Sequence, residues 1–212
     1  DAIEHRCGAP DLLVMLPGAL MTPQHMADAG LFEAVQQRGL ALDLMALDLQ
    51  ALQACNREAL QTLEHAVLAP ARTRYRRVWL GGISRGGQLA LSYLAEGLGT
   101  VQGLCLLAPY PGSRLTLNAV QRAGGLAAWQ ATAEQWRDPE FRLWHWLKQP
   151  AWPDTVFMGW GAQDRFADGM DQLAARLPTG TAAVQVPGAH DWQAWRALWD
   201  RFLDLGSFRA SP

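Results

Sequence analysis

The run Val78-Trp79-Leu80-Gly81-Gly82-Ile83-Ser84-Arg85-Gly86-Gly87 is an apolar stretch that stops at a serine bracketed by glycines. Residues 82–86 fit the pattern G-x-S-x-G, in which a strand turns sharply into a helix with the serine at the apex. Small residues are needed beside the serine because so tight a turn leaves no room for side chains two positions before and after it. The stretch therefore predicts a strand, a serine-bearing turn and a helix, in that order.

The alternative interpretation of residues 82–86 is a glycine-rich turn that carries a serine by chance. A serine hydroxyl is a weak nucleophile until a base takes its proton, so a functional serine needs a partner elsewhere in the chain. After Ser84 the sequence contains two histidines, His145 and His190. His190 follows a short apolar strand and the turn Pro187-Gly188, just before the last predicted helix. Because a base is expected on a loop at the end of a strand, His190 is the candidate.

The base in turn needs a third group that orients its imidazole ring. Residues 156–161 read as an apolar strand with a glycine turn, and Asp164 follows shortly after. Asp168 and Asp191 are rivals for the role of the acid. Asp168 is expected inside a helix, and Asp191 is too close in sequence to His190 to reach the far side of its ring. Asp164 is therefore the preferred acid.

With these segments the chain resembles the α/β-hydrolase superfamily, from about Leu12 to about Leu205. The resemblance is carried by residues 82–86, 159–164 and 188–191. The chain looks most like the small bacterial esterases and thioesterases of that superfamily. The resemblance implies the chain order serine, then aspartate or glutamate, then histidine, with both partners on loops after later strands. The residues that match this order, and would form a catalytic triad of nucleophile, acid and base, are Ser84, Asp164 and His190.

The resemblance also implies an oxyanion hole, which binds the negative charge that develops on an attacked carbonyl oxygen. One backbone N–H donor in this superfamily follows the nucleophile, here at Arg85, and the other comes from the loop after an early strand. Residues 12–16 match that strand and residues 17–20 match the loop, although many relatives have His-Gly where this chain has Pro-Gly. The second donor is therefore expected from Ala19 or Leu20. An ordinary turn between a strand and a helix is the alternative.

Strand-like and helix-like segments alternate along the chain, which predicts a parallel sheet covered by helices on both faces. Strands are expected near residues 12–17, 41–48, 77–83, 102–108, 155–160 and 182–187. Helices are expected over residues 23–38, 57–69, 86–97, 167–176 and 191–204. By comparison with the superfamily, the chain is expected to lack the amino-terminal antiparallel hairpin. The predicted fold class is therefore α/β, a reduced α/β-hydrolase fold of about six mostly parallel strands in one domain, residues 1–212.

Residues 111–153 interrupt this alternation, and they are too many for a plain crossover helix. A connection of that length usually has a function or carries structure of its own. The segment is rich in aromatic side chains, namely Trp129, Trp136, Phe141, Trp144, Trp146 and Trp152. Because the superfamily inserts a cap at this point, residues 111–153 are expected to form a small helical lid. Most of its tryptophans are expected to pack against the body of the protein, and a minority to line an apolar pocket. His145, which lies between two of these tryptophans, is expected to be packed as well.

These features together predict a serine hydrolase that cleaves a carboxylic ester or thioester of an apolar acyl or aryl substrate through an acyl-enzyme on Ser84. An acyltransferase that passes the same acyl group to an alcohol or amine is an alternative. A non-catalytic binding protein on the same fold is a third, although the presence of all three triad residues disfavours it. The sequence has no phosphate-binding glycine loop and no metal-ligand spacing, so neither a cofactor nor a metal is expected.

Composition agrees with an enzyme domain, since 212 residues suffice for one substantial core. Half of the residues are apolar, yet no run approaches the roughly 18 that a membrane span needs. A net charge of −2 without a basic stripe argues against nucleic-acid binding. Cys105 is expected to be an inert buried thiol, whereas Cys7 and Cys55 could pair if the fold brings them together. A reducing, cytoplasmic setting is favoured, although a start at Asp1 is also compatible with a cleaved signal peptide.

Overall fold

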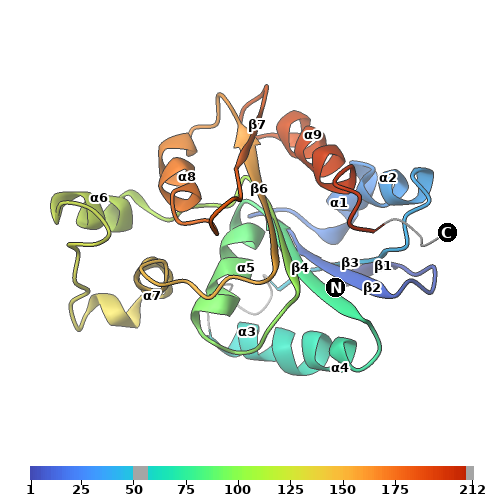
Figure 1. Ribbon diagram of the computed structural model, residues 1–212, viewed down its shortest axis with the longest axis horizontal. Coiled ribbons are helices and arrows are strands. Elements are labelled where there is room, and N and C mark those ends of the chain that lie inside the picture. Colours follow the sequence, from blue (N-terminus) through green and yellow to red (C-terminus); the bar gives the residue numbers. More distant parts are fainter. Residues whose placement is uncertain (50–56, 209–212) are drawn as a thin grey trace.

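The computed structural model describes residues 1–49 and 57–208, and its centre is a seven-stranded sheet (Figure 1). The strands are β1 (Ala2–His5), β2 (Asp11–Leu16), β3 (Asp43–Leu47), β4 (Arg77–Ile83), β5 (Gly103–Leu107), β6 (Thr155–Gly161) and β7 (Val184–Val186). Their order across the sheet is β1-β3-β2-β4-β5-β6-β7. All neighbouring pairs are parallel except β1 with β3. The predicted α/β class with a mostly parallel sheet is confirmed.

Strand β1 corrects the expectation of about six strands beginning at the strand before the oxyanion loop. It pairs antiparallel with β3, so that Ala2 lies opposite Leu47 and His5 opposite Leu44. Its residues alternate between exposed and half-buried, and none of them is fully buried. An edge strand this short, and half polar in sequence, lacks the run of apolar residues by which the central strands can be recognised.

Every connection between consecutive strands from β2 to β7 contains at least one helix, and a further helix follows β7. The helices are α1 (Pro23–Asp28), α2 (Leu31–Gln37), α3 (Arg57–Leu63), α4 (Ala69–Arg72), α5 (Arg85–Ala95), α6 (Arg114–Arg122), α7 (Pro139–Trp146), α8 (Ala167–Ala174) and α9 (Trp192–Leu203). A π-helical turn, η2 (Glu64–Leu68), joins α3 to α4, and a 3-10 turn, η3 (Gln135–Arg137), precedes α7. Helices α1, α2 and α9 cover one side of the sheet, and α3, α4 and α5 the other (Figure 1).

The helix expected over residues 23–38 is divided into α1 and α2. Its start is as the sequence indicates, because the Thr22 side chain accepts a hydrogen bond from the His25 backbone N–H. The division falls at Gly30, which has a φ of 79°. A side chain at Gly30 would overlap the guanidinium group of Arg196 on α9. The Arg196 side chain is flexible at this end and could move, so it is the left-handed conformation that favours glycine here and separates the two helices.

The central strands form the core of the molecule, and every residue of β2 and β5 is buried. Strands buried on both faces are expected to be nearly continuous runs of apolar residues, as these are. In the register of the sheet, Ile83 pairs with Leu107, and Leu107 pairs with Gly159. Strands β4, β5 and β6 therefore end at the same edge. The loops that follow β4, β6 and β7 leave the sheet side by side, at the edge where open α/β sheets bind ligands.

Residues 111–153, called the insertion below, connect β5 to β6 and contain α6, η3 and α7. The insertion extends to one side of the sheet in Figure 1, with α7 packed near α5. Its rings pack on one another, since Trp129 stacks on Phe141 with ring centroids 5.8 Å apart. Trp144 is buried, and its indole N–H donates a hydrogen bond of 2.8 Å to the Pro111 carbonyl. The insertion is thus a packed helical segment with aromatic rings at its centre.

Two remaining sequence expectations concern the membrane and the cysteines. Within residues 1–49 and 57–208, no helix is long and apolar enough to cross a membrane. Cys105 is buried in β5, as its apolar surroundings predict, and burial raises the pKa of its thiol. Cys55 lies outside the described residues, so a pairing with Cys7 stays a hypothesis.

Candidate active site

Ser84 is the apex of the turn between β4 and α5. Its φ is 50° and its ψ is −112°, a conformation that residues other than glycine rarely adopt. A side chain at Gly82 would overlap the backbone of Gly86, and one at Gly86 would overlap the carbonyl group of Leu16. Both glycines of the motif are therefore required by the closeness of neighbouring backbone, as expected from the sequence.

Backbone hydrogen bonds hold this strained turn in place. The Ser84 N–H donates to the Leu107 carbonyl at 3.0 Å, which continues the sheet beyond the last residue of β4. The Ser84 carbonyl accepts from Gln88 N–H at 3.1 Å and from Tyr110 N–H at 2.9 Å. Such a conformation costs of the order of 1–3 kcal/mol and persists only where the surroundings hold it. The fold thus fixes the direction in which the Ser84 hydroxyl points.

The structure brings the three predicted site residues together. Ser84 Oγ lies 2.8 Å from His190 Nε2, and His190 Nδ1 lies 2.6 Å from Asp164 Oδ2. The Asp164 side chain is completely buried, and the His190 side chain is 11% exposed. An imidazole ring held between a hydroxyl and a buried carboxylate has the geometry needed to take the hydroxyl proton. The G-x-S-x-G motif alone does not show that a base lies within reach of the serine hydroxyl.

Two loops that follow β6 and β7 deliver Asp164 and His190, and they are joined to each other. The Gln163 N–H donates to the Gly188 carbonyl, and the Gly188 N–H donates to Gln163 Oε1, both at 2.9 Å. A side chain at Gly161 would overlap the Gly188 carbonyl, so glycine is needed where the loops touch. The second carboxylate oxygen of Asp164 accepts from the Phe166 N–H at 2.9 Å. The acid is therefore oriented before any substrate is present.

The structure separates Asp164 from its rivals. Asp168 is an exposed residue in the first turn of α8. Asp191 caps α9, since its side chain accepts a hydrogen bond of 3.1 Å from the Ala194 N–H. His145 belongs to the insertion, where its ring lies 4.5 Å from that of Trp136 between centroids. These three residues therefore have structural surroundings of their own, apart from the Ser84 hydroxyl.

A cavity of about 470 Å³ opens at Ser84. Its described lining residues are Gly18, Ala19, Met21, Ser84, Arg85, Tyr110, Arg165, Phe166, His190 and Trp195. Of the three predicted oxyanion donors, Ala19 and Arg85 belong to this lining. Leu20 does not, and its residue surface is 94% exposed on a turn where its φ is 59°. The geometry thus favours Ala19 over Leu20 as the second donor.

Several lining residues were not expected from the sequence. The ring of His190 has edge-to-face contacts with Phe166 at 5.0 Å and with Trp195 at 5.2 Å between centroids. Tyr110 in turn has an edge-to-face contact with Phe166 at 5.1 Å. Phe166 and Tyr110 each follow shortly after a strand end, and this is the one local signal that could have identified them. Trp195 projects from the first turns of α9, and no local pattern distinguishes it from core tryptophans.

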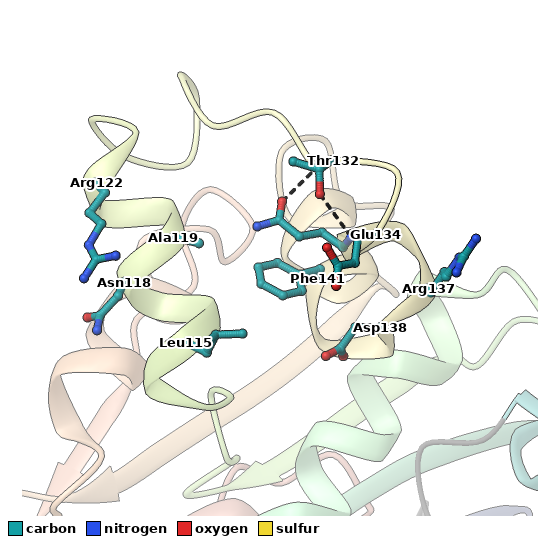
Figure 2. A pocket seen from close by; sticks show the side chains of 10 residues that line it. Leu115, Asn118, Ala119, Arg122, Thr132, Glu134, Arg137, Asp138 and Phe141 are labelled. Carbon is teal, nitrogen blue, oxygen red and sulfur yellow. Dashed lines mark hydrogen bonds between the residues drawn. The ribbon is translucent and has the colours of Figure 1, made fainter.

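The insertion has a hollow of its own, apart from Ser84, of about 880 Å³ (Figure 2). Its described lining consists of Leu115, Asn118, Ala119, Arg122, Thr132, Glu134, Gln135, Arg137, Asp138 and Phe141. None of the insertion's tryptophans is among the described residues that line the Ser84 cavity. The expectation that some of them line the substrate pocket is therefore wrong. Trp129 and Trp144 are buried and pack within the insertion, whereas Trp136 is 42% exposed.

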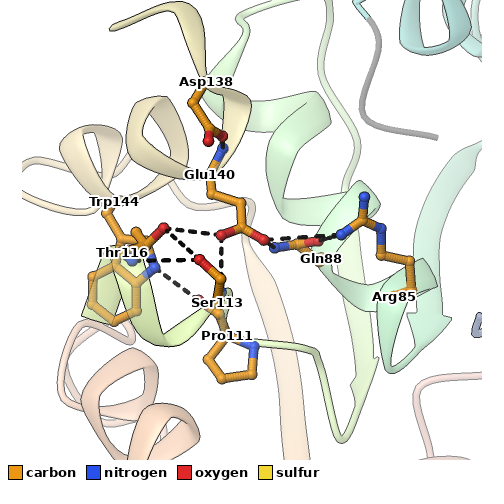
Figure 3. Close-up of polar contacts among 8 residues, drawn as sticks. All are labelled: Arg85, Gln88, Pro111, Ser113, Thr116, Asp138, Glu140 and Trp144. Atoms are coloured by element: carbon orange, nitrogen blue, oxygen red, sulfur yellow. Dashed lines mark hydrogen bonds and ion pairs between the residues drawn. The ribbon is translucent and has the colours of Figure 1, made fainter. Parts of the chain in front are cut away.

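One polar network connects the insertion to the serine turn (Figure 3). Arg85 Nη1 donates to Gln88 Oε1 at 2.8 Å, and the Gln88 amide donates to Glu140 Oε1 at 3.3 Å. The other carboxylate oxygen of Glu140 accepts from the Ser113 N–H at 2.8 Å and from the Thr116 hydroxyl at 2.9 Å. Burial by itself raises the pKa of Glu140, but these donors outweigh it and lower that pKa. Glu140 is thus held as a carboxylate.

Among the described residues, no group of three His, Cys, Asp or Glu side chains could hold a metal ion. The polar atoms nearest the Ser84 hydroxyl come instead from His190, which is already directed by Asp164. The arrangement can therefore move a proton between the serine hydroxyl and the imidazole ring without any further group.

No protein-family model and no curated protein sequence matches the chain. Solved structures, in contrast, are similar to this chain in fold. S-formylglutathione hydrolase from Staphylococcus aureus has a TM-score of 0.62 at 13% identity, covering 93% of this chain and 81% of its own. Est1E from Butyrivibrio proteoclasticus has a TM-score of 0.63 at 14% identity, covering 96% and 93%. An α/β serine hydrolase without a lid from Xanthomonas campestris has a TM-score of 0.59 at 16% identity, covering 96% and 85%. The chain therefore has the α/β-hydrolase fold.

Proposed function

We propose that the protein is a serine hydrolase that cleaves carboxylic esters or thioesters through an acyl-enzyme on Ser84. The observation that carries this proposal is the position of His190, within hydrogen-bond distance of both the Ser84 hydroxyl and the buried Asp164 carboxylate. Three loops that are distant in sequence meet to produce this arrangement. A turn that merely contained a serine would need none of these contacts.

The reaction follows from the geometry. His190 Nε2 takes the Ser84 proton while Ser84 Oγ bonds to the carbonyl carbon of the substrate, and the carbonyl oxygen becomes an oxyanion. The imidazolium then gives that proton to the leaving oxygen or sulfur as its bond to carbon breaks. A water molecule, deprotonated by His190 Nε2, then attacks the acyl carbon. The bond from that carbon to Ser84 Oγ breaks, the acid leaves, and the imidazolium returns its proton to Ser84 Oγ. Asp164 holds the ring tautomer and stabilises the imidazolium without taking the proton itself.

Backbone N–H groups of Ala19 and Arg85 would bind the oxyanion. Both residues line the cavity that contains Ser84. Ala19 comes from the loop after β2, and Arg85 directly follows the serine. Donors fixed by the fold need no reorganisation when charge develops, and losing one typically lowers turnover by about 10²–10³. The turn at residues 18–21 is itself fixed, since the Met21 N–H donates to the Gly18 carbonyl at 3.1 Å.

The cavity walls support an apolar acyl or aryl group as part of the substrate. Met21, Phe166 and Trp195 contribute apolar or aromatic surface, and the cavity volume of about 470 Å³ lies in the range of small-molecule sites. The aromatic surface thus comes from loops around His190 and from α9. The similar solved structures include proteins named as hydrolases, which agrees with this proposal.

The test is turnover of short-chain phenyl esters and a matching thioester by the wild-type protein and by Ser84→Ala. We expect the variant to lose hydrolysis entirely while its thermal unfolding stays close to that of the wild type. The substitution removes only a hydroxyl, so the strained turn and its backbone hydrogen bonds are retained. Hydrolysis that persists in Ser84→Ala, at the wild-type rate, would overturn the assignment of the nucleophile.

A further inference from the structure

Two arginines line the cavity around Ser84, and they differ in their partners. Arg85 is directed toward α7, because it donates to Gln88 and its Nη1 lies 3.9 Å from Glu140 Oε1 (Figure 3). Arg165 has no carboxylate within 4.0 Å among the described residues. Residues 50–56 and 209–212 contain no Asp or Glu. Arg165 therefore brings a positive charge to the cavity that no acidic side chain offsets.

Arg165 lies near His190, the proposed general base and acid. Its guanidinium carbon lies 4.8 Å from the centre of the Phe166 ring, and that ring has its edge-to-face contact with His190. Arg165 also directly follows Asp164, so the loop that supplies the acid supplies this cation. His190 is the group that would protonate the leaving atom. Through the Phe166 ring, Arg165 therefore lies on the side of the cavity that contains His190.

A second donor on this side also has no acceptor. Trp195 lines the cavity with its ring against His190, and its Nε1 is buried without a hydrogen-bond partner among the described residues. A buried indole N–H usually finds an acceptor. Trp195 and Arg165 thus both line the cavity that contains His190, and the exposed Arg165 guanidinium is the donor that a ligand with acceptor oxygens can reach.

We propose that Arg165 binds an anionic oxygen group, a carboxylate or a phosphate, on the leaving group of the substrate. The inference rests on the proposed hydrolase function and narrows it to esters whose alcohol or phenol portion is negatively charged. A guanidinium suits this role because its planar donors match two oxygens of a carboxylate or phosphate at once. Stacking on Phe166 would orient the donors in advance.

The experiment compares para-acetoxybenzoate with para-acetoxybenzamide, two acetyl esters that differ in the charge of the leaving group. We expect wild-type kcat/KM to be about tenfold higher for the charged ester, as for a charge-assisted hydrogen bond near solvent. Arg165→Gln should remove this preference by lowering kcat/KM far more for the charged ester than for the amide, and Arg165→Lys should retain part of it. The preference should also shrink as the salt concentration rises, because Arg165 is exposed. Para-acetoxyphenyl phosphate, tested beside the benzoate, distinguishes phosphate from carboxylate.

The matched control is Arg201→Gln, which removes an exposed arginine of α9 outside the cavity lining and should behave as the wild type. Equal kcat/KM for the two acetyl esters, or an equal loss on both in Arg165→Gln, would overturn the inference. So would a preference found only for monophenyl adipate over its neutral amide, which would move the anion to the acyl side. Loss of all turnover together with an unreactive Ser84 would instead show that the proposed function fails.

Discussion

The cavity around Ser84 and the hollow inside the insertion differ in the origin of their lining. The Ser84 cavity has a volume of about 470 Å³ and receives residues from loops after β2, β4, β5, β6 and β7. The hollow of the insertion is larger, about 880 Å³, but all its described lining lies between residues 115 and 141. The edge of a parallel sheet gathers side chains from distant segments, and a local helical segment does not. Volume alone would therefore point to the hollow of the insertion rather than to the candidate site around Ser84.

The largest expected effect is the loss of kcat when the carboxylate that contacts His190 is replaced by an amide. Asp164→Asn should lower kcat by about 10³–10⁴, because an amide cannot stabilise the imidazolium and favours the wrong ring tautomer. Thermal unfolding should change far less, since an amide oxygen can still accept the hydrogen bond from the Phe166 N–H. The measurement is ester turnover under saturating substrate, with Asp168→Asn as the control on the same loop and helix. A normal rate in Asp164→Asn combined with a large loss in Asp168→Asn would reassign the acid.

The positions of Ser84, Asp164 and His190 could be predicted because the sequence next to each of them carries a recognisable pattern. Ser84 stands between two glycines at the end of an apolar strand, and both glycines are needed to avoid overlap with nearby backbone. Asp164 and His190 likewise follow an apolar strand and a glycine turn. Parallel topology then guarantees that these strand ends share one edge, so local signals were sufficient to predict a distant encounter.

A matched pair of phenylalanines sharpens the comparison between the cavities. Phe141 is 3% exposed and stacks on Trp129. Phe141→Ala should therefore lower the free energy of unfolding by about 3 kcal/mol, with little change in kcat/KM per folded molecule. Phe166 is only half-buried and contacts His190, so Phe166→Ala should instead lower kcat/KM by about tenfold at a smaller cost in stability. Denaturant unfolding and initial rates on a neutral ester measure both. Loss of activity in folded Phe141→Ala would instead support the prediction that the insertion acts as a lid over the substrate.

The parts of the molecule that could not be predicted depend on tertiary contacts. A run of tryptophans shows that a segment packs, but not against which surface, so the insertion's rings could not be assigned to a cavity. The break between α1 and α2 falls at Gly30, which has a left-handed conformation, and the run of residues 23–38 does not by itself show that the helix stops there. Strand β1 gains its conformation from pairing with β3 at the sheet edge rather than from its own residues. Phe166 and Trp195 come from different elements and both contact the His190 ring, and Tyr110 in turn contacts Phe166.

The smallest expected effect concerns the network that joins the two regions. The pKa of Glu140 in the folded protein lies below the ordinary value of 4.5, so the carboxylate form is the stabilising one. Its contribution is present above about pH 4.5 and is lost as the pH falls through the lower folded-state value. Glu140→Gln should therefore lower stability at neutral pH by about 1 kcal/mol, and the difference from the wild type should narrow in acid.

Denaturant unfolding at neutral pH and near pH 4 would measure this difference. Glu134→Gln, an exposed position in the same insertion, is the matched control and should leave stability unchanged at both pH values. A difference between Glu140→Gln and the wild type that grows in acid would mean that the carboxyl group is protonated in the folded protein, contrary to the hydrogen bonds that surround it.

The central claim is that Ser84 is a nucleophile activated by His190. Fluorophosphonate labelling followed by peptide mapping tests it most directly, because the reagent forms a bond only with an activated hydroxyl. We expect the label on Ser84 in the wild-type protein and its absence in folded His190→Ala. No label on Ser84 in the folded wild-type protein, or equal labelling with and without His190, would contradict the account.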